Sequence, residues 1–428
     1  MKKSLPYERI VLPNGVRLIL VPMTGVNSVA TSVMVGVGSR YETPMINGIS
    51  HFLEHMVFKG TKKYPTTDDV NVIERIGGLQ NAYTDIDITN YHNKVLSTDW
   101  QLALEINKEL ALTPLLAQKH VDKERDVILE EMKRYEDEPS MKVSEVFHQM
   151  LYPGTPLGMR IIGEESSLRS SDASTLRRYH DAWYAPNRLV VVVAGNLKTQ
   201  TSSIKSQVEE WFGKRREIST GEAEKVLETQ DKPQLAVITK PDAQQAHLTL
   251  GFRTFSRGSV DRFAWSVFNL LMGVSFTSRL FKEIREKKGL CYHIRSGQDG
   301  WQDVGYWSIY AGVATNKVEE AVQAILHEMT KAVDKGVTDE EVQVAKKRLK
   351  TALAFRSEDP EFMNEWYGRQ ELFHEPIMTL EDYIKTIEKV SKSDINALLK
   401  KYIKQHTLNM ALVWSKGKEE KLEKLLTL

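Results

Sequence analysis

Residues 51–55 read HFLEH, and the interpretation of the whole chain starts from this stretch. If the stretch is helical, His51 and His55 stand at positions i and i+4 on one face, where two imidazole rings can reach a single metal ion. Glu54 lies on the same turn, next to His55. The stretch therefore predicts a metal-binding helix that carries its own carboxylate.

Zinc suits such a helix because it accepts imidazole nitrogen readily. A catalytic zinc site keeps three protein ligands and leaves the fourth position for water. Glu54 is the only residue inside the motif that could act as a base toward that water. The structural alternative is a pair of histidines on the buried face of a helix, so the hypothesis needs a third ligand.

Residues 121–137, VDKERDVILEEMKRYED, can supply that third ligand. Their apolar residues recur at helical spacing, and Glu124 and Glu131 lie two turns apart on one face. Both carboxylates can therefore point at a metal ion held by another helix. Glu130 stands beside Glu131, and spacing favours Glu131 without excluding a slip of one residue.

The stretch HFLEHMVFKGT, together with ILEEM further along, resembles the pitrilysin/insulinase family of zinc metallopeptidases. The likeness covers essentially the whole chain and is closest to the processing-peptidase branch, which includes the mitochondrial processing peptidase beta subunit and its small bacterial relatives. The resemblance implies one zinc ion per chain, held by His51, His55 and Glu131. It also implies that Glu54 activates water and that Glu124 orients a ligand histidine.

The resemblance extends to a strand beside the metal. Asn81, Ala82, Tyr83 and Thr84 resemble the family's edge strand, which pairs with the substrate backbone. Such pairing would give affinity with little side-chain specificity. The alternative is an ordinary sheet edge without a ligand.

The second half of the chain lacks any His-x-x-Glu-His pattern. Aligning residues 337–349 with residues 120–132 places Glu341 against Glu124 but Arg348 against Glu131. The second half therefore cannot rebuild the zinc site.

The second half carries a different signature, SRLFKEIREKKGLCY, at residues 278–292. Its Arg285 and Tyr292 resemble the family's arginine and tyrosine that reach the zinc site, where both could donate to the carbonyl oxygen as negative charge builds on it. Alone, the pair is typical of surface and packing residues. Many relatives are glycine-rich just before this signature, whereas this chain has Val274 and Phe276. Cys291 is expected to be a small buried residue.

The composition is that of a globular protein: 428 residues, 41% hydrophobic and 27% charged, with a net charge of +1. This balance argues against nucleic-acid and anionic-membrane partners. One cysteine excludes an internal disulfide framework. No signal peptide or membrane-spanning run is recognisable, so we expect a cytoplasmic protein without membrane insertion.

The order of predicted elements indicates an α+β fold with two similar halves, each an antiparallel-rich sheet covered by helices. We expect an N-terminal zinc-binding domain at 1–215, a polar linker at 216–233 and a C-terminal domain at 234–428. The turn Pro13-Asn14-Gly15 predicts a hairpin. Asn47 or Ser50 is expected to cap the metal helix.

The resemblance further implies that one chain forms half of a clamshell, which a second chain closes. We expect a zinc-dependent endopeptidase that hydrolyses unfolded peptides or presequence-like segments inside the closed chamber. Because one chain carries both the zinc motif and the Arg285/Tyr292 pair, a homodimer is expected, and a heterodimer with a related subunit stays open. Two alternatives are a catalytically silent scaffold or partner subunit, and a metal-binding protein without turnover. A silent subunit would have no reason to keep the complete motif.

Overall fold

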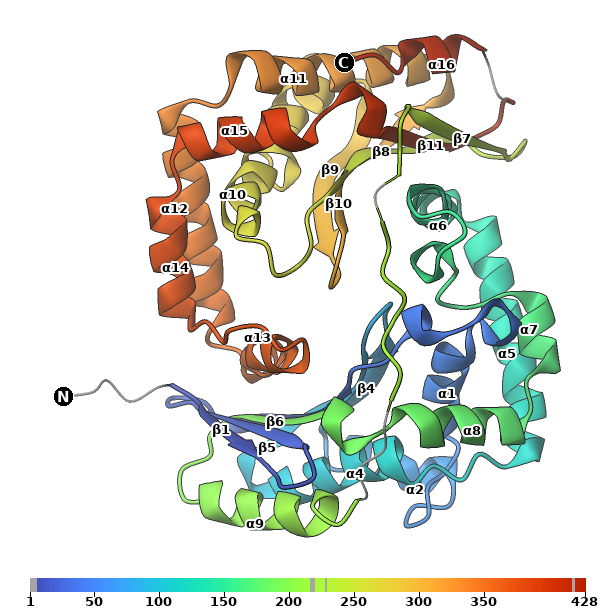
Figure 1. Cartoon of the computed structure of the whole chain (residues 1–428), viewed down its shortest axis with the longest axis vertical. Coiled ribbons are helices and arrows are strands. Elements are labelled where there is room, and N and C mark those ends of the chain that lie inside the picture. The colour runs from blue at the N-terminus through green and yellow to red at the C-terminus, as the bar shows by residue number, and fades with distance from the viewer. Residues whose placement is uncertain (1–5, 216–219, 228, 418–419) are drawn as a thin grey trace. The chain divides into compact units, whose positions relative to one another are not determined.

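The computed structural model describes residues 6–215, 220–227, 229–417 and 420–428. The chain forms two compact units. Unit 1 comprises Met1–Glu131, Met159–Glu224 and Leu353–Thr379, and unit 2 comprises Met132–Gly158, Lys225–Ala352 and Leu380–Leu428. Each unit is a mixed sheet covered by helices, which is the α+β fold expected from the sequence (Figure 1).

The sheet of unit 1 has six strands in the order β1-β2-β6-β3-β5-β4. The β2/β6 pair is parallel and the other neighbours are antiparallel. The predicted hairpin is present: the N–H of Leu12 donates to the carbonyl of Val16 at 2.8 Å, and Gly15 has a φ of 91°. The strands are β1 (Glu8–Val11), β2 (Arg17–Pro22), β3 (Ser28–Val35), β4 (Leu79–Thr84), β5 (Thr89–Leu96) and β6 (Leu189–Gly195).

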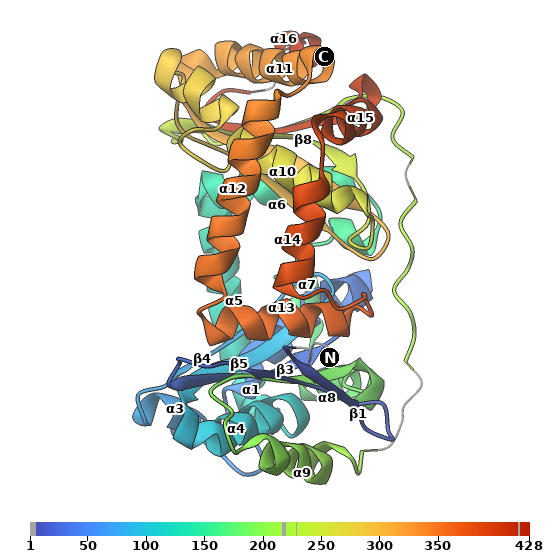
Figure 2. The same cartoon turned by 90° about the vertical axis from the view of Figure 1, so that its left-hand side faces the viewer.

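Helices cover both faces of this sheet, as Figure 2 shows for α13 on one face and for α4 and α9 near the other. The helices of unit 1 are α1 (Ile49–Val57), α2 (Thr67–Val70), α3 (Val72–Arg75), α4 (Trp100–Leu112), α7 (Glu165–Ser170), α8 (Ala173–Trp183), α9 (Thr201–Phe212) and α13 (Pro360–Leu372), with most of α5 (Gln118–Asp137).

The sheet of unit 2 repeats this plan with five strands in the order β7-β11-β8-β10-β9. Its β7/β11 pair is parallel, and antiparallel pairs follow as far as the edge strand β9. In this correspondence β9 takes the place of β4. The strands are β7 (Gln234–Thr239), β8 (Gln245–Thr254), β9 (Cys291–Gly300), β10 (Gly305–Ala314) and β11 (Leu408–Trp414).

The helices of unit 2 also lie on both faces of its sheet, with α6 on the opposite face from α11 (Figure 1). One of these helices is a π-helical segment that ends at Lys287, shortly before β9 begins at Cys291. These helices are α6 (Pro139–Leu151), α10 (Asp261–Gly273), the π-helix η6 (Phe281–Lys287), α11 (Val318–Lys335), α14 (Leu380–Lys389), α15 (Lys392–Tyr402) and α16 (Glu420–Leu425), with most of α12 (Asp339–Arg356).

The expected domains, 1–215 and 234–428, differ from these units because each sheet takes one helix from the other half of the sequence. Helix α13 packs on β3 and β6, where the buried Asn364 donates to the carbonyl oxygens of Ala30 and Val192, both at 3.1 Å. Helix α6 packs on β8 and β11 in the same way. Residues 216–219 and 228 of the expected linker lie outside the described residues.

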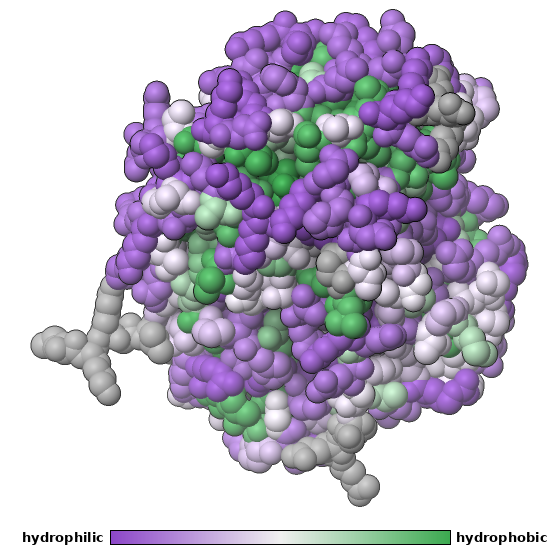
Figure 3. Space-filling view, turned by 45° about the horizontal axis from the view of Figure 1, so that its top comes forward, coloured by the Kyte–Doolittle hydropathy of each residue, from purple (hydrophilic) through white to green (hydrophobic). Residues whose placement is uncertain are grey.

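The surface is largely hydrophilic on the face shown in Figure 3, in keeping with the share of charged residues. None of the helices among the described residues is long and apolar enough to cross a membrane. The cytoplasmic location expected from the sequence stays a prediction.

Candidate functional site

Helix α1 presents the HFLEH stretch, and a buried carboxylate fixes where the helix begins. The expected caps, Asn47 and Ser50, are wrong: the N-cap is Gly48, which has no side chain. Glu42 takes over the capping role from outside the helix. Its carboxylate accepts from the backbone N–H of Gly48 at 2.6 Å and of Ser50 at 2.8 Å, and from the side chain of Asn47 at 2.9 Å. These bonds satisfy donors that the first turn of a helix leaves free.

A close approach of two glycines holds the same end of α1. Gly48 and Gly163 have φ values of 91° and 89°, and a Cβ on Gly48 would lie 2.6 Å from the carbonyl oxygen of Ile162. Any side chain at Gly48 would therefore strain the backbone and collide with the neighbouring turn. This packing fixes the start of the helix about one turn before His51.

The three residues expected as metal ligands lie together. Nε2 of His51 is 3.9 Å and Nε2 of His55 is 3.5 Å from Oε2 of Glu131. Among the described residues, one ligand atom from each of these side chains lies within 4.8 Å of the others. Ligand atoms around a tetrahedral zinc ion, bound at about 2.0–2.1 Å, lie roughly 3.3 Å apart. Glu130 is exposed and is not part of the group, so the geometry favours Glu131.

Glu124 contacts one of the histidines. Its Oε1 lies 3.0 Å from Nδ1 of His55, and its Oε2 lies 2.7 Å from Nζ of Lys59. When Nδ1 of His55 donates to this carboxylate, the lone pair of Nε2 is left for a metal ion. Burial alone would raise the pKa of Glu124, but the hydrogen bonds from His55 and Lys59 lower it overall.

The donor set fits zinc. Burial, with a smaller contribution from His55, lowers the pKa of His51 to about 3, so this imidazole stays neutral as a ligand must be. Nδ1 of His51 is buried without a hydrogen-bond partner in the described part of the chain. Two imidazoles and one carboxylate match the ligand types of a catalytic zinc site that keeps one open position.

Glu54 lies on α1 between the two histidines in sequence and next to the edge strand β4. Burial raises the pKa of Glu54, and Thr84 and His55 offset part of the rise. A raised pKa brings a carboxylate closer to neutral pH, where it can both accept and return a proton. Glu54 is thus a suitable general base.

The four residues expected to bind substrate lie on β4, at the edge of the sheet of unit 1 beside β5. The N–H of Ala82 donates to Oδ1 of the adjacent Asn81 at 2.9 Å. The hydroxyl of Tyr83 donates to Glu365 of α13 at 2.6 Å, so this side chain is held by packing. Backbone groups of β4 are therefore the ones available to a peptide.

The two residues expected from the C-terminal half lie together in unit 2. Arg285 is on η6 and Tyr292 on β9, and the guanidinium carbon of Arg285 is 5.6 Å from the centre of the Tyr292 ring. The Tyr292 side chain is 79% exposed. Cys291 is buried, and burial raises the pKa of its thiol to about 11, which keeps it protonated and unreactive. The roles of Arg285 and Tyr292 stay a prediction.

Two residues of the site were missed at the sequence level. Lys59 lies four residues after His55, in the turn that follows α1, and this spacing could have indicated its contact with Glu124. Glu42 carried no such signal. Its partners Asn47, Gly48 and Ser50 follow a turn, so their spacing from Glu42 matches no regular contact along a helix or strand.

Comparisons with known proteins agree on one family. Residues 18–165 match the model for insulinase (peptidase family M16), and residues 171–349 match the peptidase M16 inactive domain. The chain is 34% identical to the uncharacterized zinc protease YmxG of Bacillus subtilis, over 91% of this chain and 94% of that protein. It is 31% identical to the zinc protease SCO5738 of Streptomyces coelicolor, over 91% and 86%. The crystal structure of a protease from Helicobacter pylori has the same fold, with a TM-score of 0.89 at 23% identity, covering 96% of this chain and 100% of that one.

Proposed function

Because this chain belongs to the insulinase family of peptidases, family M16, we propose that it is a zinc-dependent endopeptidase acting on unfolded peptides or presequence-like segments. One observation carries the proposal. The ligand atoms of His51, His55 and Glu131 lie within 4.8 Å of one another, on two helices, with the half-buried carboxylate of Glu54 on the same helix as the histidines.

The residues of the site divide the work of peptide hydrolysis. His51, His55 and Glu131 would hold zinc, which supplies a Lewis acid and lowers the pKa of water when it is bound. Glu54 accepts the proton of the attacking water and returns it to the leaving amine. Glu124 keeps His55 in the tautomer that leaves Nε2 free.

Substrate would bind as an added strand on β4. In an antiparallel sheet, every second residue of an edge strand directs its N–H and C=O outward. A peptide bound there should therefore tolerate backbone N-methylation at alternate residues only. N-methylated substrate analogues test this directly: a KM that rises equally at successive positions would contradict strand addition.

We further propose that two copies of this chain close the chamber, with Arg285 and Tyr292 donating to the carbonyl oxygen during attack. Size-exclusion chromatography with light scattering decides the oligomeric state. A monomer would contradict the homodimer, and a stable complex only with a related chain would favour the heterodimer. The cytoplasmic location belongs to the same proposal and is tested by cell fractionation.

The decisive experiment is cleavage of fluorogenic unstructured peptides. Activity should disappear with a zinc chelator and return when zinc is restored. Glu54→Gln should keep its zinc, measured by elemental analysis, and lose at least about a hundredfold in kcat. Glu130→Gln is the matched control, because Glu130 is exposed and outside the ligand group. Zinc-loaded protein without cleavage would favour the scaffold or partner-subunit alternative.

A further inference from the structure

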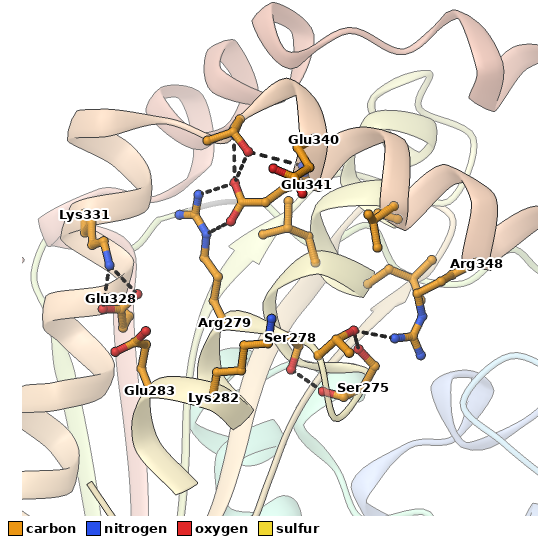
Figure 4. Close-up of a pocket in the computed structure, with 16 residues that line it drawn as sticks. Ser275, Ser278, Arg279, Lys282, Glu283, Glu328, Lys331, Glu340, Glu341 and Arg348 are labelled. Atoms are coloured by element: carbon orange, nitrogen blue, oxygen red, sulfur yellow. Dashed lines mark hydrogen bonds and ion pairs between the residues drawn. The ribbon is translucent and has the colours of Figure 1, made fainter. Parts of the chain in front are cut away.

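Unit 2 contains a pocket of about 500 Å³ between the loop after α10, the π-helix η6 and the helix α12 (Figure 4). Its position within unit 2 corresponds to that of the metal site within unit 1, since both lie between a short helical segment and a long helix that carries a carboxylate. The alignment of the two long helices already places Glu341 against Glu124 and Arg348 against Glu131.

The carboxylate of this second site is paired with a fixed positive charge. Arg279 donates from Nε and Nη2 to the two oxygens of Glu341, both at 2.6 Å. In unit 1 the corresponding Glu124 contacts the ring of His55 with one oxygen and Nζ of Lys59 with the other. A bidentate arginine pair is strong and leaves the carboxylate little capacity to bind a cation.

Two further positive charges line the pocket without such a partner. No carboxylate lies within ion-pair distance of Lys282 or Arg348 in the part of the chain that the structure describes. The other lining acids are engaged or peripheral: Glu328 is 3.2 Å from Lys331, Glu283 pairs with Lys287, and Glu340 is exposed at the start of α12.

Hydroxyl groups stand between these two positive charges. Arg348 donates to Oγ1 of Thr277 at 2.7 Å, and this hydroxyl lies 3.1 Å from Oγ of Ser275. The backbone N–H of Lys282 donates to the carbonyl of Ser278, which brings η6 to the same loop. Figure 4 shows Lys282 and Arg348 on either side of Ser275 and Ser278.

We propose that this pocket binds an oxyanion, a carboxylate or a phosphate group, held by Lys282 and Arg348 with the hydroxyls of Ser275 and Thr277. Two cations in one pocket repel each other, and an anion between them removes the repulsion and adds charge-assisted hydrogen bonds. Both side chains are exposed, so a ligand can reach them from solvent. The pocket thus has the position in unit 2 that the metal site has in unit 1, but Lys282 and Arg348 make it suited to an anion rather than a cation. This proposal does not depend on peptidase activity.

The test uses the full-length Glu54→Gln protein, so that no peptide is cleaved during binding. Inorganic phosphate is titrated at constant ionic strength and followed by isothermal calorimetry. We expect saturable binding that weakens at least tenfold in Lys282→Gln/Arg348→Gln. The matched control is Lys347→Gln/Lys400→Gln, which removes the same charge from exposed positions outside the pocket lining. Equal binding by both double variants, or no saturable binding to the parent protein, would overturn the proposal.

A second arm distinguishes the two sources of the oxyanion. Acetylated peptides ending in a free carboxylate are compared with the same peptides ending in an amide, by competition against phosphate. If only the peptides with a free carboxylate compete with phosphate, the ligand of the pocket is a peptide carboxylate. If phosphate binds and neither peptide competes, the ligand is a phosphoryl compound. Competition by acid and amide alike would show that the carboxylate is not recognised and would count against the peptide source.

Discussion

Replacing Glu124 by Gln should weaken zinc binding without unfolding the protein. Glu124 is buried and makes two contacts, one to Nδ1 of His55 at 3.0 Å and one to Nζ of Lys59 at 2.7 Å. A glutamine of the same shape has one acceptor and one donor end. Whichever way its amide turns, one of the two contacts becomes a donor facing a donor.

The size of the effect follows from the role of that carboxylate. Residues that orient a metal-bound histidine typically contribute 10–100-fold to metal affinity, which corresponds to about 1.4–2.7 kcal/mol. The unfolding free energy of the metal-free protein should fall by less, on the order of 1 kcal/mol, because Lys59 and His55 are partly exposed and solvent screens their charges. Zinc affinity should therefore fall by more than metal-free stability.

The assay is a competition for zinc between the protein and a chromophoric chelator, with urea unfolding of the metal-free protein measured in parallel. Glu130→Gln on the same helix is the control, because its side chain is exposed and outside the ligand group. An unchanged dissociation constant in Glu124→Gln would refute the orienting role. An equal loss of zinc affinity in Glu124→Gln and Glu130→Gln would show that the effect comes only from the change in net charge.

Three further predictions concern the surroundings of the site. Burial raises the pKa of Glu42 from the ordinary 4.5 to about 7. Between these two pH values the folded state binds more protons than the unfolded state. The unfolding free energy of the metal-free protein should therefore fall by up to about 3 kcal/mol as pH rises from 4.5 to 7. Urea unfolding across this range should show that fall in the wild type relative to Glu42→Gln, which cannot titrate; parallel curves would contradict it. Asn364→Ala leaves two strand carbonyls and the hydroxyl of Ser32 without their partner, and should cost roughly 2–4 kcal/mol in urea unfolding; a loss below 1 kcal/mol would argue that α13 is not part of the core of unit 1. Tyr83→Phe removes the bond to Glu365 at 2.6 Å and the long bond from Arg369 at 3.5 Å, so it should lower the unfolding free energy by about 1 kcal/mol and leave kcat unchanged; a large fall in kcat would place this hydroxyl in the chemistry.

Most elements of both sheets could be predicted from periodicity, since their residues carry local signals. Periodicity predicts strands at Leu79–Thr84 and Leu408–Trp414 and a helix at Val318–Lys335, and the structure has all three with these bounds. Periodicity also predicts one helix at 68–76, but the structure has two short helices there, α2 and α3, which meet at Asn71. Asparagine competes with the helix for its own backbone hydrogen bonds, so a break there is physically reasonable.

Helix α13 and strand β9 were not predicted, and both depend on tertiary contacts. Residues 360–372 show little helical amphipathicity, because Asn364 and Gly368 face a sheet that approaches closely. A Cβ on Gly368 would lie 2.6 Å from Cε of Met34. Strand β9 alternates polar and apolar residues weakly, since it is the edge of its sheet.

The sequence by itself determined the local geometry of the candidate site. Spacing along one helix sets His51, Glu54 and His55 on adjacent turns, and this geometry is a property of the helix whatever surrounds it. The tertiary structure alone decided which glutamate joins the histidines and which helix each sheet receives from the other half of the sequence. These outcomes depend on contacts between residues far apart in the chain, for which local spacing carries no information.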